Sequence, residues 1–385
     1  MSTQHEAESE TQQHPIAQQS DDDELVQVLD AEGRVLPNAE VPDLSEEELL
    51  SMYRDIKLAR RYDQRAISFQ RQGRIATYAP MTGQEGSQVA TSYALDEQDW
   101  LFPTYRDHAA KYVHGMELYS LLSPLQGHRE GYSIPDDVNV LPEYIPIATQ
   151  IPQAMGMAWG YQLQGETDRA CLCHFGDGAT SEGDFHEGLN FAGVFDAPAV
   201  FVCNNNQWAI SVPREKQTAS ETIAQKADGY GIEGVRVDGM DPLAVYQVTR
   251  EAILKAKNPG PDESRPTLIE SVQYRYGAHT TADDPSVYRD GDEAERWRDW
   301  DPVDRLEGYL RREDILDDEL AAEIDEDIEA EIQEAIQRAT QTSSDPEDIV
   351  DHVYEEKTPQ LEQQLEELNE LREKYGDDAL VEMGE

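Results

Sequence analysis

Short apolar runs alternate with helical segments between residues 170 and 280 of the chain. Four of these runs read RACLCHF, APAVFVC, GVRVDG and PTLIESVQYRY. Strands and helices that alternate in this way usually build a mainly parallel sheet that is wrapped by helices. The pattern therefore predicts an α/β fold.

Helical periodicity appears on both sides of this region. Over residues 45–58 the apolar positions recur near helical spacing, and Ser45 followed by Glu48 resembles a capping box at the start of a helix. Beyond about residue 303, an isoleucine recurs every four residues from Ile324 to Ile336 on an acidic background. This second pattern predicts a long amphipathic helix.

These patterns divide the chain into three parts. Residues 1–40 are mainly Gln, Asp, Glu and Ser with little to bury, which predicts a disordered acidic tail. Residues 41–303 should form the α/β domain that carries the ligand site. Residues 304–385 should form a helical acidic extension that docks on partner subunits.

The chain has 385 residues and a formal charge of −49, from 80 acidic and 31 basic residues. This charge repels nucleic acids and anionic membranes and is typical of proteins from a salt-saturated cytoplasm, so we expect a halophilic, cytoplasmic protein. No apolar run approaches the roughly 20 residues that span a bilayer, and the first residues lack the pattern of a secretory signal. Cys171, Cys173 and Cys203 lie in apolar runs without metal-binding spacing, which indicates buried free thiols.

Polar residues follow two of the predicted strands. Asp177 lies between two glycines after the first strand, and Asn206 is the last of three asparagines after the second. If the strands are parallel, both loops lie at the carboxyl edge of one sheet, where open α/β folds bind ligands. Carboxylate, amide and carbonyl oxygens suit magnesium, and glycines allow a diphosphate to approach the backbone. The sequence thus predicts a magnesium-bound diphosphate at this edge.

Other readings of the same residues are weaker. A dinucleotide-binding fingerprint needs a third glycine where Ser181 stands, and a phosphate-binding loop needs a Gly-Lys-Ser/Thr sequence that is absent here. Ordinary turns would account for either motif alone. They do not account for both motifs after neighbouring strands.

The stretch GDGATSEGDFHEGLNFAGVF with NNNQWAIS resembles the thiamine-diphosphate motif of the α subunits of 2-oxo acid dehydrogenase E1 components. This family includes pyruvate and branched-chain 2-oxo acid dehydrogenases. Between about residues 45 and 360, further segments resemble the family in the same order: GRIATYAPMTGQEGSQVA, FPTYRDH, IPDDVNVLP, ATQIPQAMG, RVDGMDPLAVY and YRYGAHTTADDPSVYR. The resemblance implies the thiamine-diphosphate-binding fold.

The resemblance also implies a reaction and its partners. The chain would be an E1 α subunit for the oxidative decarboxylation of pyruvate or a branched-chain 2-oxo acid, with acyl transfer to the lipoyl domain of an E2 component. An acetoin dehydrogenase α subunit and a non-catalytic, cofactor-binding subunit stay open as alternatives. In this family a separate β subunit supplies the glutamate that activates the cofactor, so an α2β2 heterotetramer is implied.

Roles for individual residues follow from the resemblance. Magnesium would be bound by the side chains of Asp177 and Asn206 and by the carbonyl of Trp208. The implied contacts to thiamine diphosphate are Tyr105, Arg106, Ile147, Gly176, Gly178, Ala179, Asn204 and His279. The implied catalytic residues are His279, His128 and Glu130.

This chain departs from the family at several of these positions. Glu130 stands where relatives often carry a second histidine, which leaves substrate choice open. Asn204 stands where some relatives place an arginine. Met81 and Thr82 replace a bulkier pair and are expected to line the substrate pocket.

Two further segments have two interpretations each. PIATQIPQ resembles the potassium-binding segment of branched-chain enzymes and indicates either a potassium site or a structural turn, with Pro146, Thr149 and Gln150 as the candidate ligands. The loop after His279 either orders around the cofactor and helps to receive the lipoyl domain, or is a solvated acidic loop. Its candidate residues are Arg275, Asp283, Tyr288 and Arg289.

Overall fold

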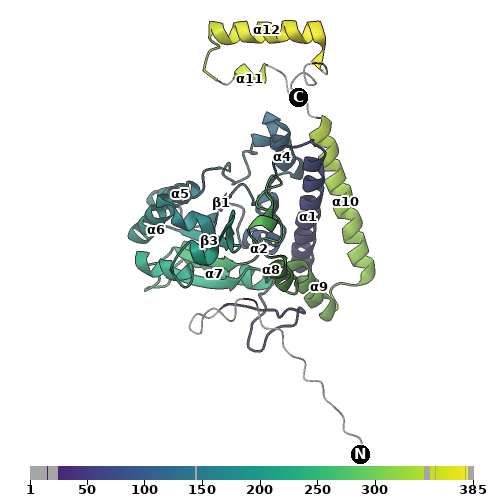
Figure 1. The fold of residues 1–385 in the computed structure, drawn as a ribbon. Coiled ribbons are helices and arrows are strands. Elements are labelled where there is room, and N and C mark those ends of the chain that lie inside the picture. The colour runs from purple at the N-terminus through teal and green to yellow at the C-terminus, as the bar shows by residue number, and fades with distance from the viewer. Residues whose placement is uncertain are drawn as a thin grey trace, which may run out of the picture.

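The computed structural model describes residues 25–143, 145–341, 347–351 and 353–377, together with Pro15 and Ala379, but not the side chains of Arg129 and Glu130. At its centre lies a five-stranded parallel sheet in the order β1-β2-β3-β7-β6 (Figure 1). The strands are β1 (Trp100–Phe102), β2 (Cys171–Gly176), β3 (Ala199–Asn205), β6 (Glu233–Asp238) and β7 (Thr267–Val272). A short antiparallel hairpin, β4 (Trp208–Ala209) with β5 (Val212–Pro213), follows β3. The predicted α/β fold is confirmed.

Both faces of the sheet are covered, because alternate residues of each strand enter different cores. In β2, Leu172 joins the core that contains α1 (Glu46–Arg71), whereas Cys171 and Cys173 join a second core. The first core also receives α2 (Glu85–Tyr93) and α7 (Pro242–Lys257), and the second receives α5 (Gln150–Gln164) and α6 (Gly183–Phe195). All three cysteines are buried and free, as predicted.

The remaining elements are shorter or lie outside these two layers. The α-helices are α3 (His108–Val113), α4 (Leu118–Leu122), α8 (Gly291–Arg298), α9 (Pro302–Arg312), α10 (Asp318–Gln341), α11 (Asp348–Asp351) and α12 (Pro359–Tyr375). The 3-10 helices are η1 (Ser123–Gln126), η2 (Arg129–Tyr132), η3 (Asp177–Ser181), η4 (Arg214–Lys216), η5 (Ala224–Tyr230) and η6 (Pro285–Val287). No helix in the described part of the chain combines the length and the apolar character that a bilayer span needs.

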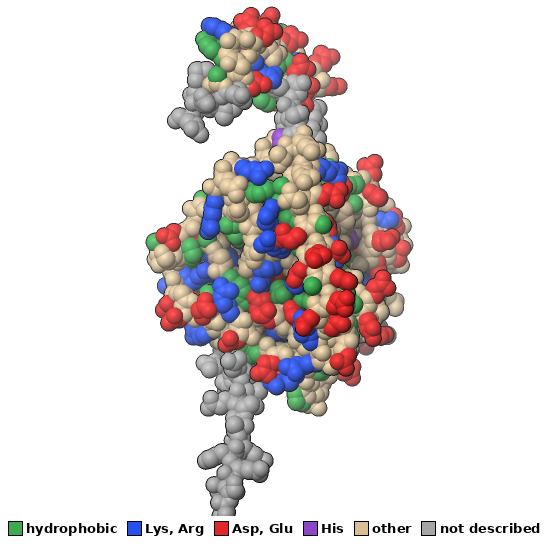
Figure 2. All heavy atoms as spheres, turned by 90° about the vertical axis from the view of Figure 1, so that its right-hand side faces the viewer, with side chains coloured by type: hydrophobic (Ala, Val, Ile, Leu, Met, Phe, Trp, Pro, Cys, Tyr) green, Lys and Arg blue, Asp and Glu red, His purple; other side chains and the backbone are tan. Residues whose placement is uncertain are grey.

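The predicted helices at both ends of the domain are present. Ser45 and Glu48 form the expected capping box of α1. The isoleucines of α10 enter the same core as α1, so this part of the 304–385 region packs on its own chain. Between the two helices, basic side chains of α1 pair with acidic ones of α10, and Figure 2 shows both charges on this face. α12 lies apart from this body (Figure 1) and buries none of its residues.

The predicted disordered tail is wrong from residue 25 onward. Val26 pairs with Val237 at the edge of the sheet, and Val28 and Leu29 are fully buried in the main core. The backbone amides of Val28 and Leu29 donate to the buried carboxylate of Asp241, each at 2.7 Å. Residues 25–36 are richer in apolar side chains than the residues before them, and a buried carboxylate satisfies two of their backbone amides. The rest of the predicted tail, except Pro15, lies outside the described residues.

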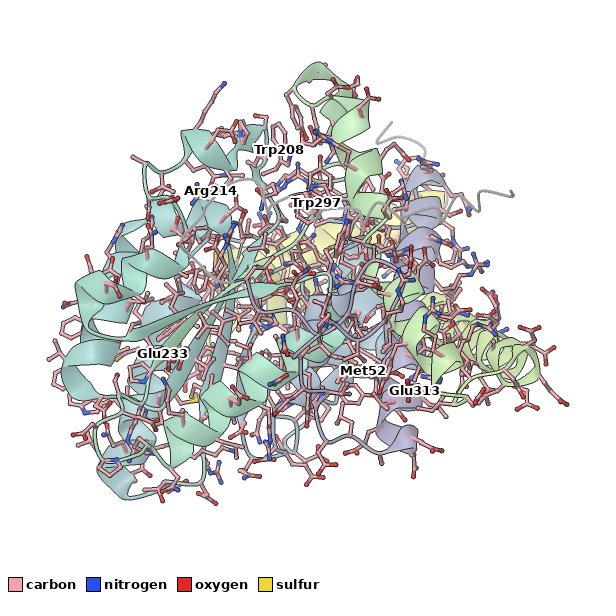
Figure 3. All side chains as sticks on the ribbon, turned by 90° about the horizontal axis from the view of Figure 1, so that it is seen from below. Met52, Trp208, Arg214, Glu233, Trp297 and Glu313 are labelled. Atoms are coloured by element: carbon pink, nitrogen blue, oxygen red, sulfur yellow. The ribbon has the colours of Figure 1, made fainter. Side chains whose placement is uncertain are left out.

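The strand register decides where the predicted ligand residues meet. Gly176, the last residue of β2, lies opposite Asn204 of β3, and Asn204 lies opposite Ser271 of β7. The loops after all three strands therefore leave the sheet at one edge. In Figure 3, Trp208 and Arg214 lie on this side, and Glu233 at the start of β6 lies on the other.

Candidate active site

A cavity of about 210 Å³ lies at the carboxyl edge of the sheet. Its walls come from the loops after β1, β2, β3 and β7 and from the segment before α5. Eleven of the thirteen predicted site residues line it: Tyr105, Arg106, Ile147, Gly176, Asp177, Gly178, Ala179, Asn204, Asn206, Trp208 and His279. The structure thus brings together residues that are separated by up to 174 positions in the chain.

The turns after β2 and β3 present the candidate metal ligands. Asp177 begins η3, only 2% exposed, and Asn206 is 6% exposed at the end of the next strand. Gly178 is required by close packing, because a Cβ at this position would lie 2.9 Å from the Cβ of Ala209. The amide of Asn206 donates to Oε1 of Gln84 at 3.0 Å, and its Oδ1 accepts from the backbone of Trp208 at 3.2 Å.

Asp177 is an acid that the protein buries without a cation. No salt bridge to it occurs among the described residues, and its closest polar partner is Nε2 of Gln217 at 2.5 Å. Burial raises the pKa of Asp177 to about 6, and the bond from Gln217 opposes this rise. A carboxylate in this state favours binding a cation.

Two arginines show the complementary feature. Arg106 is 6% exposed and Arg275 is 1% exposed, yet neither forms a salt bridge in the described part of a chain with 80 acids. The guanidinium of Arg106 donates to the carbonyls of Pro80 and His279, and that of Arg275 donates to the carbonyls of Trp208 and Ile210. Buried charges are normally paired, so these two mark a site for an anion.

His279 lies beside Arg106 in the lining of the cavity. Nη2 of Arg106 is 3.0 Å from Nδ1 of His279, and the ring of Tyr105 meets the imidazole edge-on with centroids 6.2 Å apart. Burial, Arg106 and Arg275 lower the pKa of His279 to about 4. Since a guanidinium only donates, Nδ1 is the acceptor and the neutral ring carries its proton on Nε2.

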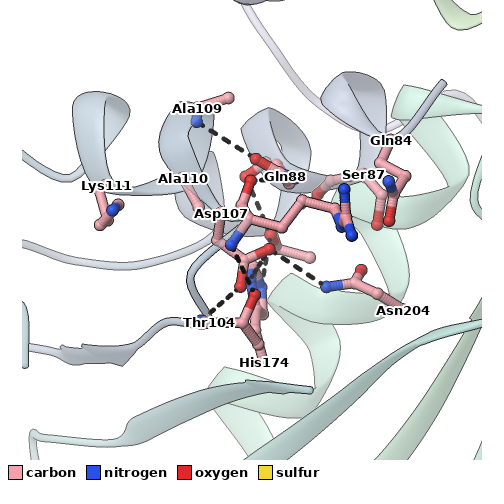
Figure 4. A network of polar contacts seen from close by, with 12 residues as sticks. Gln84, Ser87, Gln88, Thr104, Asp107, Ala109, Ala110, Lys111, His174 and Asn204 are labelled. Atoms are coloured by element: carbon pink, nitrogen blue, oxygen red, sulfur yellow. Dashed lines mark hydrogen bonds and ion pairs between the residues drawn. The ribbon is translucent and has the colours of Figure 1, made fainter. Parts of the chain in front are cut away.

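A buried network holds the loop after β1 (Figure 4). Oδ2 of Asp107 accepts from the backbone of Thr104 at 2.6 Å, and Oδ1 lies 3.5 Å from Nδ1 of His174 and 3.4 Å from Nδ2 of Asn204. Burial opposes ionisation of Asp107, but His174 and Thr104 lower its pKa overall. A charged Asp107 thus fixes the turn that carries Arg106.

Some predicted residues lie elsewhere. His128 is partly buried next to η1 and is not among the cavity-lining residues. The side chain of Glu130 lies outside the described part of the structure. Met81 packs in the main core at 1% exposure, which places it behind the cavity wall rather than on it.

The potassium segment forms a turn. Oγ1 of Thr149 donates to the carbonyl of Pro146 at 2.6 Å, and Nε2 of Gln150 donates to the carbonyl of His174 at 2.7 Å. These bonds use hydrogens of the two side chains and leave oxygen lone pairs on Thr149 and Gln150, so a potassium site stays a proposal beside the structural turn.

Sequence reasoning missed several side chains that complete the site. Gln84, Asp107 and Gln217 were not predicted, although Gln84 and Asp107 lie inside segments that resemble the family. Their position next to predicted residues was the only available signal. Gln217 had none, because it lies 40 residues from Asp177 in the chain.

The residues present fit a magnesium-bound diphosphate. Asp177, Asn206 and the carbonyl of Trp208 offer three hard oxygens in one wall, and magnesium takes its remaining ligands from water and phosphate. Arg106 and Arg275 supply the positive charge that a diphosphate needs. No group of three or more His, Cys, Asp or Glu side chains within the described residues forms an alternative metal centre.

Comparison with known proteins shows the family of the chain. The family model described as "Dehydrogenase E1 component" matches residues 53–347. The pyruvate dehydrogenase E1 component subunit alpha of Bacillus subtilis (strain 168) is 46% identical over 299 residues, which cover 77% of this chain and 79% of that protein. The proteins of the same name from Staphylococcus aureus (strain Mu50) and Staphylococcus epidermidis (strain RP62A) are both 44% identical over 302 residues, covering 78% of this chain and 80% of each. The chain therefore belongs to the dehydrogenase E1 component family of oxidoreductases.

Proposed function

We propose that the chain is the α subunit of a pyruvate dehydrogenase E1 component that binds thiamine diphosphate through magnesium. Family membership implies the cofactor, an E1 β partner and an E2 acceptor. The single observation that carries the cofactor site is the charge arrangement in the cavity. Asp177, Arg106 and Arg275 line one cavity, and none of these buried charges forms a salt bridge among the described residues, as a site for a metal and its diphosphate would require.

Each wall of the cavity then has a task. Asp177, Asn206 and the carbonyl of Trp208 would hold magnesium, and Gly178 and Ala179 would present backbone to the diphosphate. Arg106 would bind the diphosphate, and the charged Asp107 network would keep its turn in place. Tyr105, Ile147, Gly176 and Asn204 would complete the contact surface around the cofactor.

When bound, thiamine diphosphate supplies a carbon nucleophile and an electron sink for decarboxylation. The chain's own contribution at this point is His279, which is neutral near pH 7 with its proton on Nε2. A neutral imidazole can donate that proton to a developing oxyanion without adding a competing positive charge. His128 and Glu130 are further candidates for the substrate side of the reaction.

The partner assignment is also a proposal. We infer an α2β2 heterotetramer, in which the β subunit supplies the remaining catalytic groups and an E2 lipoyl domain receives the acyl group. The exposed helix α12 supports docking by the C-terminal region, because it buries none of its residues on the described part of its own chain. Asp283 supports an ordered loop after His279: its Oδ2 accepts from the amide of His279 at 2.7 Å and from the hydroxyl of Tyr288 at 2.5 Å.

The decisive experiment is an assay of the purified αβ complex with an artificial electron acceptor. Pyruvate should be oxidised with a higher kcat/KM than branched-chain 2-oxo acids or acetoin, and activity should need both thiamine diphosphate and magnesium. A preference for branched-chain acids or for acetoin would refute pyruvate as the substrate. No turnover with any of them, although the complex binds the cofactor, would favour a non-catalytic subunit.

A Glu130→His variant tests substrate choice directly. If Glu130 faces the pocket, the ratio of kcat/KM for pyruvate to that for branched-chain acids should change. The same ratio in both proteins would place Glu130 outside the site.

A further inference from the structure

The loop between β3 and η5 is anchored at both ends by one buried carboxylate. Glu270, at 1% exposure in the middle of β7, accepts through Oε1 from Nδ2 of Asn205 at 2.7 Å. Its Oε2 accepts from the backbone amides of Ile223 at 2.8 Å and Ala224 at 3.0 Å. The residues directly before and directly after segment 206–222 thus bind to the same side chain.

The first anchor controls the turn that carries the candidate metal ligands. Asn205 uses its Oδ1 to accept from the backbone amide of Gln207 at 3.3 Å, and Gln207 adopts a left-handed conformation with φ 72°. A non-glycine residue in that conformation needs support from its surroundings. Asn206 and Trp208 flank this turn, so the Glu270–Asn205 contact sets where their oxygens lie.

The centre of the segment closes on the remaining ligand. Gln217 reaches Asp177 at 2.5 Å with the same Nε2 that bonds the carbonyl of Val212 at 3.1 Å. Arg214 connects the beginning and the end of the segment. Its guanidinium donates to the carbonyl of Ser220 at 2.9 Å, and its backbone amide donates to the carbonyl of Gln207 at 2.9 Å. The segment therefore runs from the ligands Asn206 and Trp208 at its start to the Asp177 carboxylate, which Gln217 contacts.

We propose that Glu270 and Gln217 are positioning residues that make segment 206–222 a clamp for the metal site. Glu270 holds the first end of the segment through Asn205 and the second end through the amides of Ile223 and Ala224. Gln217 holds the Asp177 carboxylate in the orientation that accepts the metal. This inference rests on the proposed magnesium site. It adds residues that would touch neither the metal nor the cofactor but act through the groups that do.

Substitution of Glu270 by Gln tests the outer anchor. The Gln side chain keeps the shape of Glu but has one acceptor oxygen in place of two. Either Asn205 or the backbone amides of residues 223 and 224 therefore lose their acceptor. In the αβ complex with thiamine diphosphate, the dissociation constant for Mn²⁺, followed by its electron paramagnetic resonance signal, should rise about 10- to 100-fold. Trypsin should also cut the full chain faster after Arg214 and Lys216 in the absence of cofactor.

Asp241→Asn is the control, because Asp241 is another buried carboxylate that accepts from backbone amides, at Val28 and Leu29 and at the start of α7. It should lower thermal stability without changing the Mn²⁺ dissociation constant or cleavage within segment 206–222. Gln217→Ala serves as the second test variant, because Gln217 is only partly buried and its loss should leave the fold intact. It should weaken Mn²⁺ binding and speed cleavage as Glu270→Gln does.

Asp177→Asn separates the two proposals. Tight Mn²⁺ binding by Asp177→Asn would overturn the metal site and the clamp with it. Loss of Mn²⁺ binding by Asp177→Asn, but unchanged binding and cleavage in Glu270→Gln and Gln217→Ala, would overturn the clamp alone. If Glu270→Gln does not fold, Gln217→Ala decides in the same way.

Discussion

Replacing Asp177 with Asn should stabilise the metal-free protein while it abolishes metal binding. Burial raises the pKa of Asp177 from its usual 3.8 to about 6, so the folded chain holds a proton on this carboxyl more tightly than the unfolded chain does. Each unit of pKa shift corresponds to about 1.4 kcal/mol, and the pKa rises by about two units. Ionisation of Asp177 above pH 6 therefore lowers the free energy of unfolding by roughly 3 kcal/mol. Asn carries no charge and can still accept the hydrogen bond from Gln217.

The sign of the pH dependence follows from the direction of the shift. A carboxyl whose pKa is raised in the folded state does not lower the free energy of unfolding below pH 3.8, where it is protonated in both states. Above this pH the loss of stability grows until the pH passes about 6. The gain from Asp177→Asn should therefore be about 2–3 kcal/mol at pH 8 and roughly half of that at pH 5. Urea denaturation of the metal-free chain at the two pH values, at constant salt, measures both.

A matched substitution and a ligand complete the design. Asp107→Asn, in the same cavity wall, should destabilise the chain at pH 8, because His174 and Thr104 lower the pKa of Asp107. Saturating magnesium and thiamine diphosphate should then stabilise the unchanged αβ complex by about 3 kcal/mol at 100 times the dissociation constant, and the Asp177→Asn complex hardly at all. A metal-free Asp177→Asn chain that is less stable than the unchanged chain at pH 8 would refute the reasoning.

Three further predictions follow from the structure. His279 should stay neutral to near pH 5 by NMR, and Arg106→Gln should raise the pKa of His279, since Arg106 and burial keep it near 4; an unchanged titration would contradict this. Asp63→Ala should lower the free energy of unfolding by about 1–3 kcal/mol, because it leaves the Tyr78 hydroxyl and the backbone amides of Met81 and Thr82 without their acceptor, whereas Asp136→Ala at an exposed position should not. Finally, circular dichroism should show loss of structure as potassium chloride is dialysed away, since the Debye length grows from about 3 Å at 1 M to about 30 Å at 0.01 M; full structure in millimolar salt would argue against a halophilic protein.

The fold and the two ligand turns could be predicted because their signals are local. An apolar run predicts a strand without knowledge of its neighbours, and Asp177 and Asn206 each come directly after such a run. The rule that parallel strands end at one edge then brings the two side chains together. The capping box of α1 and the isoleucine repeat of α10 are local in the same sense.

The N-terminal segment shows where local signals fail. Seven of the twelve residues in 25–36 are apolar, but residues 1–24 are mostly polar, so the composition of the whole segment 1–40 predicts disorder, yet Leu29 is fully buried. What orders it is a buried group of charges: Arg305 bonds Asp238 at 2.8 Å, and Asp241 binds the segment's amides. These partners lie more than 200 residues away in the chain, and no pattern in the segment itself indicates them.

The supports of the site were hidden for a related reason. Glu270 is the one charged residue of a fully buried strand, where an acid alone would predict a poorly packed core. Its use becomes visible only when β7 lies beside β3, because then its carboxylate lies under the Asn205 turn and the amides of residues 223 and 224. Burying an ionised acid costs little free energy when it accepts from three donors. A buried acid without donors would take up a proton or move to the solvent. Ligands of a site can therefore be found from the residues that end the strands, but the residues that hold them must be found from the contacts that the sheet creates.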